Sequence, residues 1–404
     1  MHAEKFIVRE PLVNSQERVL GYDIAWQGAD AADAPRGEAD ILFLAGFVAD
    51  QLNDTDCGAL LGDQIIFIEA RPALLEHETI LALPPKGTIL VLRGCDLSGD
   101  GVVEAVAAAR RRGYGISLRD ADISLLDKGL LGHVTHIETA IDSPAFAAQV
   151  QQFRALNSLT IRLVARRVQS WQAFELCRKL DILAFVGNLH LTPRPGQHAR
   201  ELNPAQSLIL QLMDMVRQNA DVKQLEGVLK RDAALSYKLL RYINSAGFGL
   251  GCEIQSLKHA VTMLGYSPLY RWLALLLATA TTTGYSPVLM HAAIVRGRFA
   301  ELLGGTFLPR QEAENLFVAG MFSLLDKLLG VPMEDVLEKI QLSESVTQAL
   351  LSREGIYGPF LALAEACEMH SGAVDAMASS LCIDARQVNQ AQLSALAWAQ
   401  RIAL

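Results

Sequence analysis

Charged side chains stand within or just after several short apolar runs in the first half of this 404-residue sequence. These residues are Asp23, Glu69, Arg119, Asp120, His136, Glu138, Arg166 and Arg167. Carboxylate oxygens are the ligands that Mg²⁺ prefers. Arginine binds phosphate or carboxylate through two parallel hydrogen bonds and keeps its proton. The set therefore suits a metal centre, an anion site or a network of internal ion pairs.

The runs that would position these residues alternate with helical patterns. Eight candidate strands are Phe6–Val8, Val19–Ile24, Ile65–Ile68, Thr88–Leu92, Gly115–Leu118, Val134–Ile137, Thr160–Val164 and Ile182–Val186. Such alternation predicts a parallel sheet, either open or closed into a barrel. The first two strands are the exception, because Asn14–Glu17 predicts a hairpin turn between them. In a barrel, sites form at the carboxyl ends of the strands, and we expect these charged residues near that face.

The second half of the sequence has a different hydrophobic pattern. Thr192–Gly196 contains two prolines and a glycine, which is typical of a linker, and only helical stripes follow it. One such stripe begins after Ser256 and ends before Gly265. We therefore expect two domains, an α/β domain over residues 1–195 and an all-helical domain over residues 196–404.

Composition narrows the possible functions. The net charge of −8 argues against broad nucleic-acid binding. None of the six cysteines forms a CxxC pair, the amino terminus lacks an apolar signal core, and the most apolar stretch, Trp272–Ala280, is too short to span a membrane. We expect a soluble cytoplasmic protein with neither membrane nor nucleic-acid partners.

Two segments near the amino terminus, Arg9–Val13 (REPLV) and Leu20–Ile24 (LGYDI), resemble the opening of EAL domains. That family hydrolyses the bacterial second messenger cyclic di-GMP with two metal ions held at the carboxyl ends of barrel strands. The resemblance implies a βα barrel here. Because 195 residues are few for eight strand–helix units, we expect a trimmed barrel of the TIM type.

Three segments of the second half resemble HDOD domains in order: Asp232–Ala246, Ile254–Gly265 and Phe317–Asp326. HDOD domains are similar to HD phosphohydrolases without the metal-binding His-Asp pair, which falls here on Ser323-Leu324. The resemblance implies an all-helical, HD-like domain that works by binding partners. Its signature residues in this sequence are Asp232, Arg241, Asn244, Ser245 and His259. Asp232 also fits a plain role as a helix N-cap. Candidate anchors for a partner are Tyr237, Arg241, Phe248, Tyr270 and Trp272.

The barrel half departs from the EAL pattern at most metal-binding positions. The signature Glu falls on Asp23, the Asn of the next strand on Glu69, and the first Asp of a pair on Arg119, with Asp120 beside it. The Lys-x-Asp strand falls on His136 and Glu138, and a later Lys-Val pair on Arg167 and Val168. These positions form the remnants of a degenerate site.

A cation that cannot be neutralised would stand where a metal ligand is needed. We expect Arg119, and with it Arg167, to pair with Asp23, Glu69, Asp120 or Glu138, although the same residues could also be solvated strand ends. On this basis we expect no metal, no cofactor and no enzymatic activity.

Three functions remain open. The first is a non-catalytic bacterial signalling or scaffold protein that acts through protein partners, with a homodimer possible. The second is a cyclic di-GMP receptor that binds nucleotide through Arg119, Arg166 and Arg167. The third is a residual cyclic di-GMP phosphodiesterase. The sequence leaves open the partner, the pathway and the oligomeric state.

Overall fold

The computed structural model describes residues 5–27, 37–53, 64–158, 160–192, 194, 204–244, 254, 256–279, 286–330, 332–339 and 342–402. The chain divides into two compact units. The barrel unit comprises Met1–Thr192 and Cys367–Gly372, and the helical unit comprises Pro193–Ala366 and Ala373–Leu404. The division near residue 192 lies close to the boundary expected at residue 195. The transfer of Cys367–Gly372 to the barrel unit is a difference, since that segment lies far along the chain from the barrel.

The strands of the barrel unit close into a ring in sequence order, from β1 to β8 and back to β1. They are β1 Ile7–Asn14, β2 Val19–Trp26, β3 Ile65–Glu69, β4 Thr88–Arg93, β5 Gly115–Arg119, β6 His136–Ala140, β7 Arg162–Arg166 and β8 Ala184–Val186. Neighbours are parallel except β1, which runs antiparallel to both β2 and β8. The hairpin arises because the Asn14 side chain accepts hydrogen bonds from the backbone of Gln16 and Arg18 and so tightens the turn.

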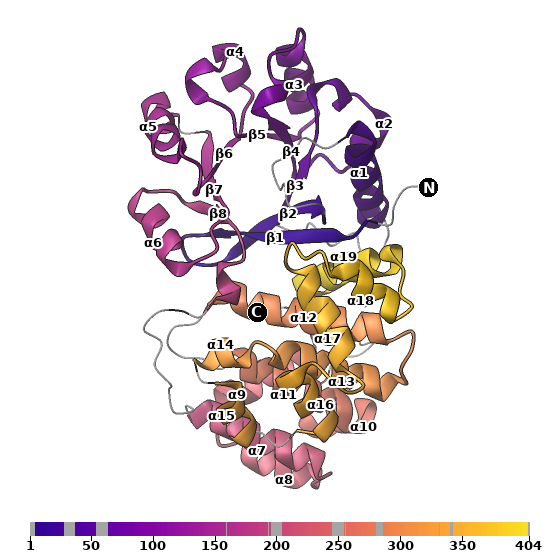
Figure 1. Ribbon diagram of the computed structural model, residues 1–404. Helices are drawn as coiled ribbons and strands as arrows, with labels where there is room; N and C mark the ends of the chain where they lie inside the picture. Colours follow the sequence, from indigo (N-terminus) through magenta and orange to yellow (C-terminus); the bar gives the residue numbers. More distant parts are fainter. Residues whose placement is uncertain are drawn as a thin grey trace. The chain divides into compact units, whose positions relative to one another are not determined.

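Helices surround this ring on the outside, as Figure 1 shows. They are α1 Glu38–Asn53, α2 Glu78–Leu81, α3 Val102–Arg111, α4 Lys128–Leu131, α5 Phe146–Leu156 and α6 Trp171–Lys179. Two of them, α2 and α4, are only four residues long. The barrel unit is therefore small because some of its helices are short, while the ring keeps all eight strands.

The lower part of the barrel interior is apolar. Side chains alternate between the two faces of a strand, and one face of each strand supplies the interior cluster. Its members are Leu12, Phe67, Ile89, Val91, Val164, Ala184 and Val186. Glycine at position 21 lets β2 lie close to β3, because a Cβ there would lie 1.8 Å from the Ile65 carbonyl oxygen. This cluster fixes which residues farther along each strand also face inward.

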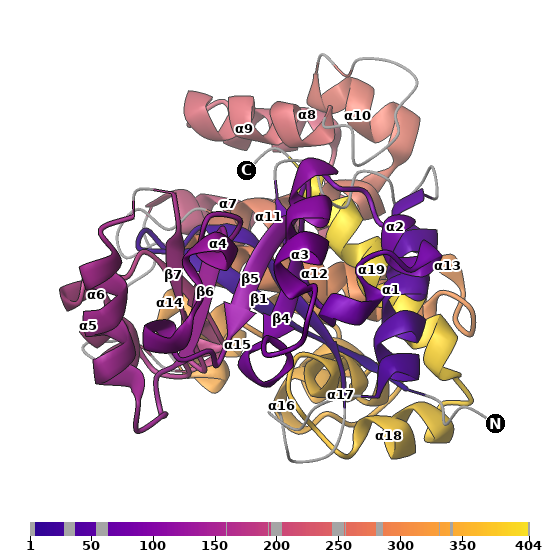
Figure 2. The same ribbon diagram turned by 90° about the horizontal axis from the view of Figure 1, so that it is seen from above.

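The helical unit contains no strand among its described residues. Its helices are α7 Pro204–Arg217, α8 Val222–Leu229, α9 Ala233–Ile243, α10 Leu257–Leu264, α11 Tyr266–Thr279, α12 Pro287–Gly304, α13 Arg310–Phe322, α14 Leu325–Leu329, α15 Met333–Lys339, α16 Glu344–Ser352, α17 Gly358–Cys367, α18 Val374–Ser380 and α19 Ala385–Gln400. Figure 2 shows α8, α9 and α10 grouped at one end of this unit. The all-helical fold expected for the second half is confirmed.

Helix α12 forms the centre of the helical unit, since side chains on nearly all its faces are buried. It approaches α13 very closely. A Cβ on Gly320 would lie 2.8 Å from the Cα of Gly297 and 2.9 Å from the Arg296 carbonyl oxygen. Glycine at this crossing therefore allows the two backbones to touch.

Within the described ranges, no helix combines the length and the apolar character needed to cross a bilayer.

Candidate functional site

A layer of charged side chains closes the carboxyl end of the barrel interior. Register places them on the inward face of the strands, toward the carboxyl ends of the parallel strands β2 to β7, with Glu10 of antiparallel β1 opposite Asp23. This charged layer consists of Glu10 on β1, Asp23 on β2, Glu69 on β3, Arg93 on β4, Arg119 on β5, Glu138 on β6 and Arg166 on β7. Except for Glu10, which is half-buried, all of these residues are buried. Four carboxylates and three guanidinium groups thus face one another in a small volume.

Arg119 is the centre of the layer. Its Nη2 donates to Asp23 Oδ2 and its Nε donates to Glu138 Oε2, both at 2.7 Å. The first bond joins β5 to β2 and therefore runs across the barrel interior. Burial alone would lower the pKa of Arg119, but Asp23 and Glu138 outweigh it and raise that pKa above its ordinary value. Arg119 is thus held as a permanent cation between two acids.

Two further arginines complete the pairing. Arg93 forks onto Glu69, with Nε 2.8 Å from Oε1 and Nη2 3.3 Å from Oε2. Arg166 lies 3.3 Å from Glu138 and 3.9 Å from Asp23. Arg119 and Arg166 therefore share the same two acids.

Glu10 lies at the edge of the layer. Its pKa is raised, first by burial and then by the nearby charge of Asp23. His370, Arg166 and Arg119 act in the opposite direction, because their positive charges favour the carboxylate. The charge of Glu10 therefore depends on burial and on charged groups from several strands.

Ser117 and His136 are neutral polar residues that lie two positions before Arg119 and Glu138 on β5 and β6, just below the charged layer. Ser117 donates to Glu138 Oε1 at 2.6 Å. The His136 ring lies edge-on to Phe67, with 5.2 Å between centroids, and its Nδ1 is 2.9 Å from the Thr135 hydroxyl. Burial, followed by the charges of Arg162 and Arg110, lowers the pKa of His136 to about 4. His136 is thus a neutral interior residue at pH 7.

The structure brings Asp23, Glu69, Arg119, Glu138 and Arg166 into the layer and leaves two predicted residues outside. Arg167 pairs instead with Asp142 at 2.8 Å, in a solvent-accessible position, and Asp120 is exposed. Both follow a strand end in the left-handed conformation, with φ of 58° and 54°. The expectation that Arg167 or Asp120 joins the ion pairs is wrong, because the strand side chains alternate and the next residue turns away.

Three members of the site escaped the sequence interpretation: Glu10, Arg93 and Ser117. Arg93 directly follows the predicted strand Thr88–Leu92. Like Arg119, it is a charged residue directly after an apolar run, and this position could have identified it, although the EAL metal motif would have a carboxylate there.

A metal pair does not fit the residues as they are arranged. Hard cations need several converging oxygen ligands with net negative charge. Here Asp23, Glu69 and Glu138 are each within ion-pair distance of an arginine. No group of three or more His, Cys, Asp or Glu residues in the described part of the chain is arranged to hold a metal ion.

In the helical unit, the predicted signature residues mostly organise the backbone. Asp232 Oδ1 accepts from the Leu235 amide at the start of α9. Asn244 binds the backbone of Ile254 on both sides, through its Nδ2 at 2.8 Å and its Oδ1 at 2.7 Å. The His259 amide donates to the Ser256 side chain at the start of α10. Ser245 lies outside the described residues.

The predicted anchors of a partner surface divide into exposed and buried residues. Tyr237 is 67% exposed and Arg241 is also exposed, whereas Trp272 is 1% exposed and belongs to the core. Phe248 lies outside the described residues. Trp272 is therefore not available as an anchor, because its helix α11 is packed against α7 and α13.

The position expected to replace the HD metal pair holds an arginine contact. The buried Ser323 hydroxyl accepts from Arg296 Nη1 at 2.8 Å and donates to the Gly320 carbonyl. Arg296 also pairs with Glu365 at 3.0 Å. A guanidinium group has no electron pair for a cation and repels it by charge, so Arg296 disfavours a metal ion beside Ser323.

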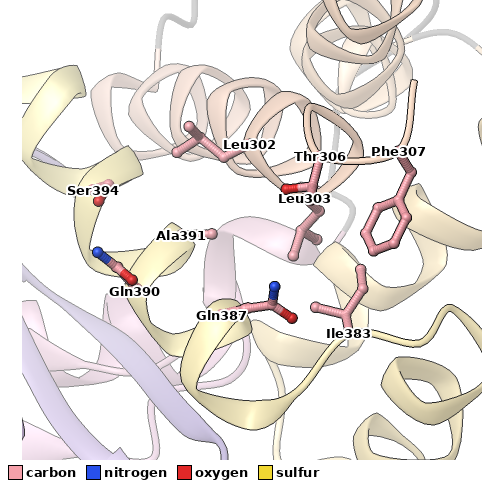
Figure 3. Close-up of a pocket in the computed structure, with 9 residues that line it drawn as sticks. All are labelled: Leu302, Leu303, Thr306, Phe307, Ile383, Gln387, Gln390, Ala391 and Ser394. Atoms are coloured by element: carbon pink, nitrogen blue, oxygen red, sulfur yellow. The ribbon is translucent and has the colours of Figure 1, made fainter. Parts of the chain in front are cut away.

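The helical unit also has a cavity of about 340 Å³ between the end of α12 and the start of α19. Figure 3 shows its lining, in which Leu302, Leu303 and Phe307 face Ile383 and the amides of Gln387 and Gln390. No lining residue carries a charge. It lacks the HDOD signature residues.

Comparison with known proteins places both units. Residues 202–352 match the HDOD domain family. The "Cyclic di-GMP phosphodiesterase CdgJ" of Vibrio cholerae is 25% identical over 402 residues, which is 98% of this chain and 93% of the relative. The "Uncharacterized protein YuxH" of Bacillus subtilis is 20% identical over 412 residues, 98% of each chain.

Solved structures of EAL proteins match a little under half of this chain at low identity and low TM-score. The EAL enzyme Bd1971 with cAMP and cyclic di-GMP bound has a TM-score of 0.37 and 13% identity, over 46% of this chain and 61% of that chain. The PaMucR phosphodiesterase with cyclic di-GMP has a TM-score of 0.36 and 15% identity, over 48% of this chain and 93% of that chain.

One expectation needs correction at this point. The departures from the EAL metal motif predicted that the chain is not an enzyme. The relative from Vibrio cholerae, which aligns with nearly the whole chain, is named a phosphodiesterase. That finding overturns the prediction, because altered motif residues alone do not decide activity.

A closed βα barrel therefore precedes an HDOD domain in a chain that aligns over almost its full length with a protein of cyclic di-GMP metabolism. The chain thus combines a closed eight-stranded barrel with an all-helical unit in which residues 202–352 match the HDOD domain family.

Proposed function

We propose that this protein acts in cyclic di-GMP signalling, with the nucleotide bound at the carboxyl end of the barrel and a protein partner bound by the helical unit. The observation that carries the proposal is the convergence of Arg93, Arg119 and Arg166 at the face where barrels bind ligands. Arginine grips phosphate oxygens and the edge of guanine bidentately. Cyclic di-GMP offers two phosphates and two guanines.

The acids of the charged layer are the groups that a bound phosphate would replace as partners of the arginines. In the absence of nucleotide, Asp23 and Glu138 neutralise the buried arginines and keep them in position. A phosphate can take the place of a carboxylate as the partner of a guanidinium group. Arg166 is a candidate for this exchange, since it lies 3.3 Å from Glu138 and 3.9 Å from Asp23, the two acids that Arg119 also binds.

Isothermal titration of the full chain with cyclic di-GMP tests the binding. We expect heat of binding in the wild type and an affinity at least about tenfold lower in Arg166→Met, since charge-assisted bonds contribute about 1.5–3 kcal/mol. The matched control is Arg178→Met on α6, which breaks an exposed ion pair with Glu175 and should leave affinity unchanged. Absence of binding to the wild type at near-millimolar nucleotide would refute the proposal.

Hydrolysis of cyclic di-GMP is the second candidate, and the name of the Vibrio cholerae relative favours it. The assay is chromatographic detection of a linear dinucleotide after incubation with Mg²⁺ or Mn²⁺. Any metal route through Asp23 and Glu138 would first require Arg119 to release them. Product formed by the wild type, and a changed rate in Arg119→Met, would support this candidate over binding alone.

The partner-binding half of the proposal rests on the helical unit. Tyr237 and Arg241 are exposed on one helix, α9, next to the Asn244 contact that fixes its end. Affinity capture with the full chain should retain a partner that Tyr237→Ala loses. Equal capture by both proteins would contradict this surface.

A further inference from the structure

No helix follows strand β1, because the hairpin turn leads straight into β2. Its two faces nevertheless carry buried or half-buried charges. Arg9 points outward and is 5% exposed, while Glu10, the next residue, points into the charged layer. The partners of both residues come from a segment more than 350 positions away in sequence.

That segment is Cys367–Gly372, which belongs to the barrel unit although it lies between α17 and α18 in the chain. The Glu368 carboxylate pairs with Arg9 at 3.6 Å, and both side chains are buried. The Glu368 carbonyl accepts from Asn188 Nδ2 at 2.9 Å. A buried arginine needs such a counter-charge, since an unpaired buried charge is strongly destabilising.

A single amide side chain holds the rest of the segment. Gln27, just after β2, donates from Nε2 to the Met369 carbonyl at 2.9 Å and accepts through Oε1 from the Ser371 amide at 3.0 Å. The two bonds fix the backbone on both sides of His370. They explain why the segment keeps a defined position against the barrel without regular secondary structure.

His370 faces the inner side of β1. Its Nε2 lies 4.0 Å from Glu10 Oε2, and its charge favours the ionised form of Glu10. The other charges that act on Glu10 come from Asp23 on β2, Arg119 on β5 and Arg166 on β7. The segment thus touches the same strand on both faces, through an ion pair outside and a charge contact inside.

We infer that Glu368 and His370 are positioning residues of the barrel site, supplied by the carboxyl-terminal half of the sequence. Glu368 holds β1 in place through Arg9, and His370 sets the charge balance at Glu10. This inference deepens the proposed function and rests on it only for the identity of the ligand.

Amide hydrogen exchange of the full chain tests the outer contact without any ligand. Glu368→Gln leaves Arg9 buried beside a neutral partner, and we expect amides of β1 and β2 to exchange at least about tenfold faster. Glu175→Gln is the matched control, since it removes an exposed acid of the same unit. The double variant Arg9→Met with Glu368→Met should recover most of the protection. Unchanged exchange in Glu368→Gln, or no recovery in the double variant, would overturn the outer contact.

The inner contact has a readout that a purely structural role would not move. At about pH 8, where histidine is ordinarily neutral, His370→Arg restores the cation and should slow exchange of the Ser371 amide about twofold to fivefold. The gain should vanish when Glu10→Gln is also present. The same gain in both backgrounds, or none in either, would reject the role of His370.

These experiments contain no nucleotide. A failure of the titration with cyclic di-GMP would therefore refute the proposed function alone, and a failure of the exchange cycle would refute the positioning role alone. If both hold, addition of cyclic di-GMP to the wild type should change the exchange of residues 367–372, while Glu368→Gln should abolish that change.

Discussion

Replacement of Arg119 by methionine isolates the contribution of the charged layer. The substitution keeps most of the side-chain volume but removes two 2.7 Å bonds to Asp23 and Glu138, which are themselves buried. The contacts of both acids to Arg166 remain, as does the hydrogen bond from Ser117 to Glu138. Breaking a buried ion pair from one side costs about 3–5 kcal/mol, so we expect a loss of about 4 kcal/mol in the free energy of unfolding of the barrel unit.

The assay is amide exchange of the β5 and β6 amides in the full chain, because a two-unit protein need not unfold in one step. A loss of about 4 kcal/mol corresponds to roughly thousandfold faster exchange from the open state. Arg119→Lys keeps the positive charge but not the two-pronged hydrogen bonding, and its exchange rates should lie between those of the wild type and Arg119→Met. Arg178→Met, which breaks an exposed pair, should stay within about 0.5 kcal/mol of the wild type.

The pH dependence separates lost charge from lost packing. Without Arg119, the buried negative charges of Asp23 and Glu138 lose their main counter-charge, and protonation at low pH removes that cost. The loss in free energy of unfolding caused by Arg119→Met should therefore be smallest near about pH 5, where the acids can be protonated, and largest near about pH 8. A deficit below about 1 kcal/mol, or one independent of pH, would refute the view that Arg119 is the counter-charge of these acids.

Two other predictions concern single side chains. The lowered pKa of His136, about 4 against an ordinary 6.5, means that the unfolded chain takes up its proton first as pH falls. The barrel unit should therefore lose up to about 3 kcal/mol between those values, and His136→Gln should flatten this acid slope in β6 exchange; an unchanged slope would count against it. Asn244→Ala removes both bonds to Ile254 and should cost about 2 kcal/mol, measured as exchange at the end of α9. Asn244→Asp, which keeps only the acceptor, should lose about half of that; equal losses in the two variants would argue against the paired contact.

Strand–helix alternation predicted the barrel half well. Every predicted strand has a counterpart in the ring, and the Asn14–Glu17 turn produces the expected hairpin. The boundaries were less certain, since several strands run one or two residues farther than their apolar runs. Charged residues such as Arg119 and Arg166 end strands here, because the interior supplies buried partners that a local pattern does not reveal.

Those extensions also explain the errors at the site. With a strand ending at Val164, Arg166 and Arg167 are equivalent loop residues. With β7 running to Arg166, alternation sends Arg166 inward, and Arg167 leaves toward Asp142. Arg93 likewise ends β4, and its register opposite Arg119 places it in the layer.

The sequence by itself determined the order and type of the elements, the two-part organisation and the placement of arginines among acids near the strand ends, because these depend on local periodicity and residue type. The tertiary structure decided which acid each arginine pairs with, since Arg119 reaches Asp23 only when the ring closes. It also decided that Glu368 and His370 belong to the barrel. No local pattern predicts that contact, because a buried Arg9 and a partner some 360 residues away meet only once the chain has folded.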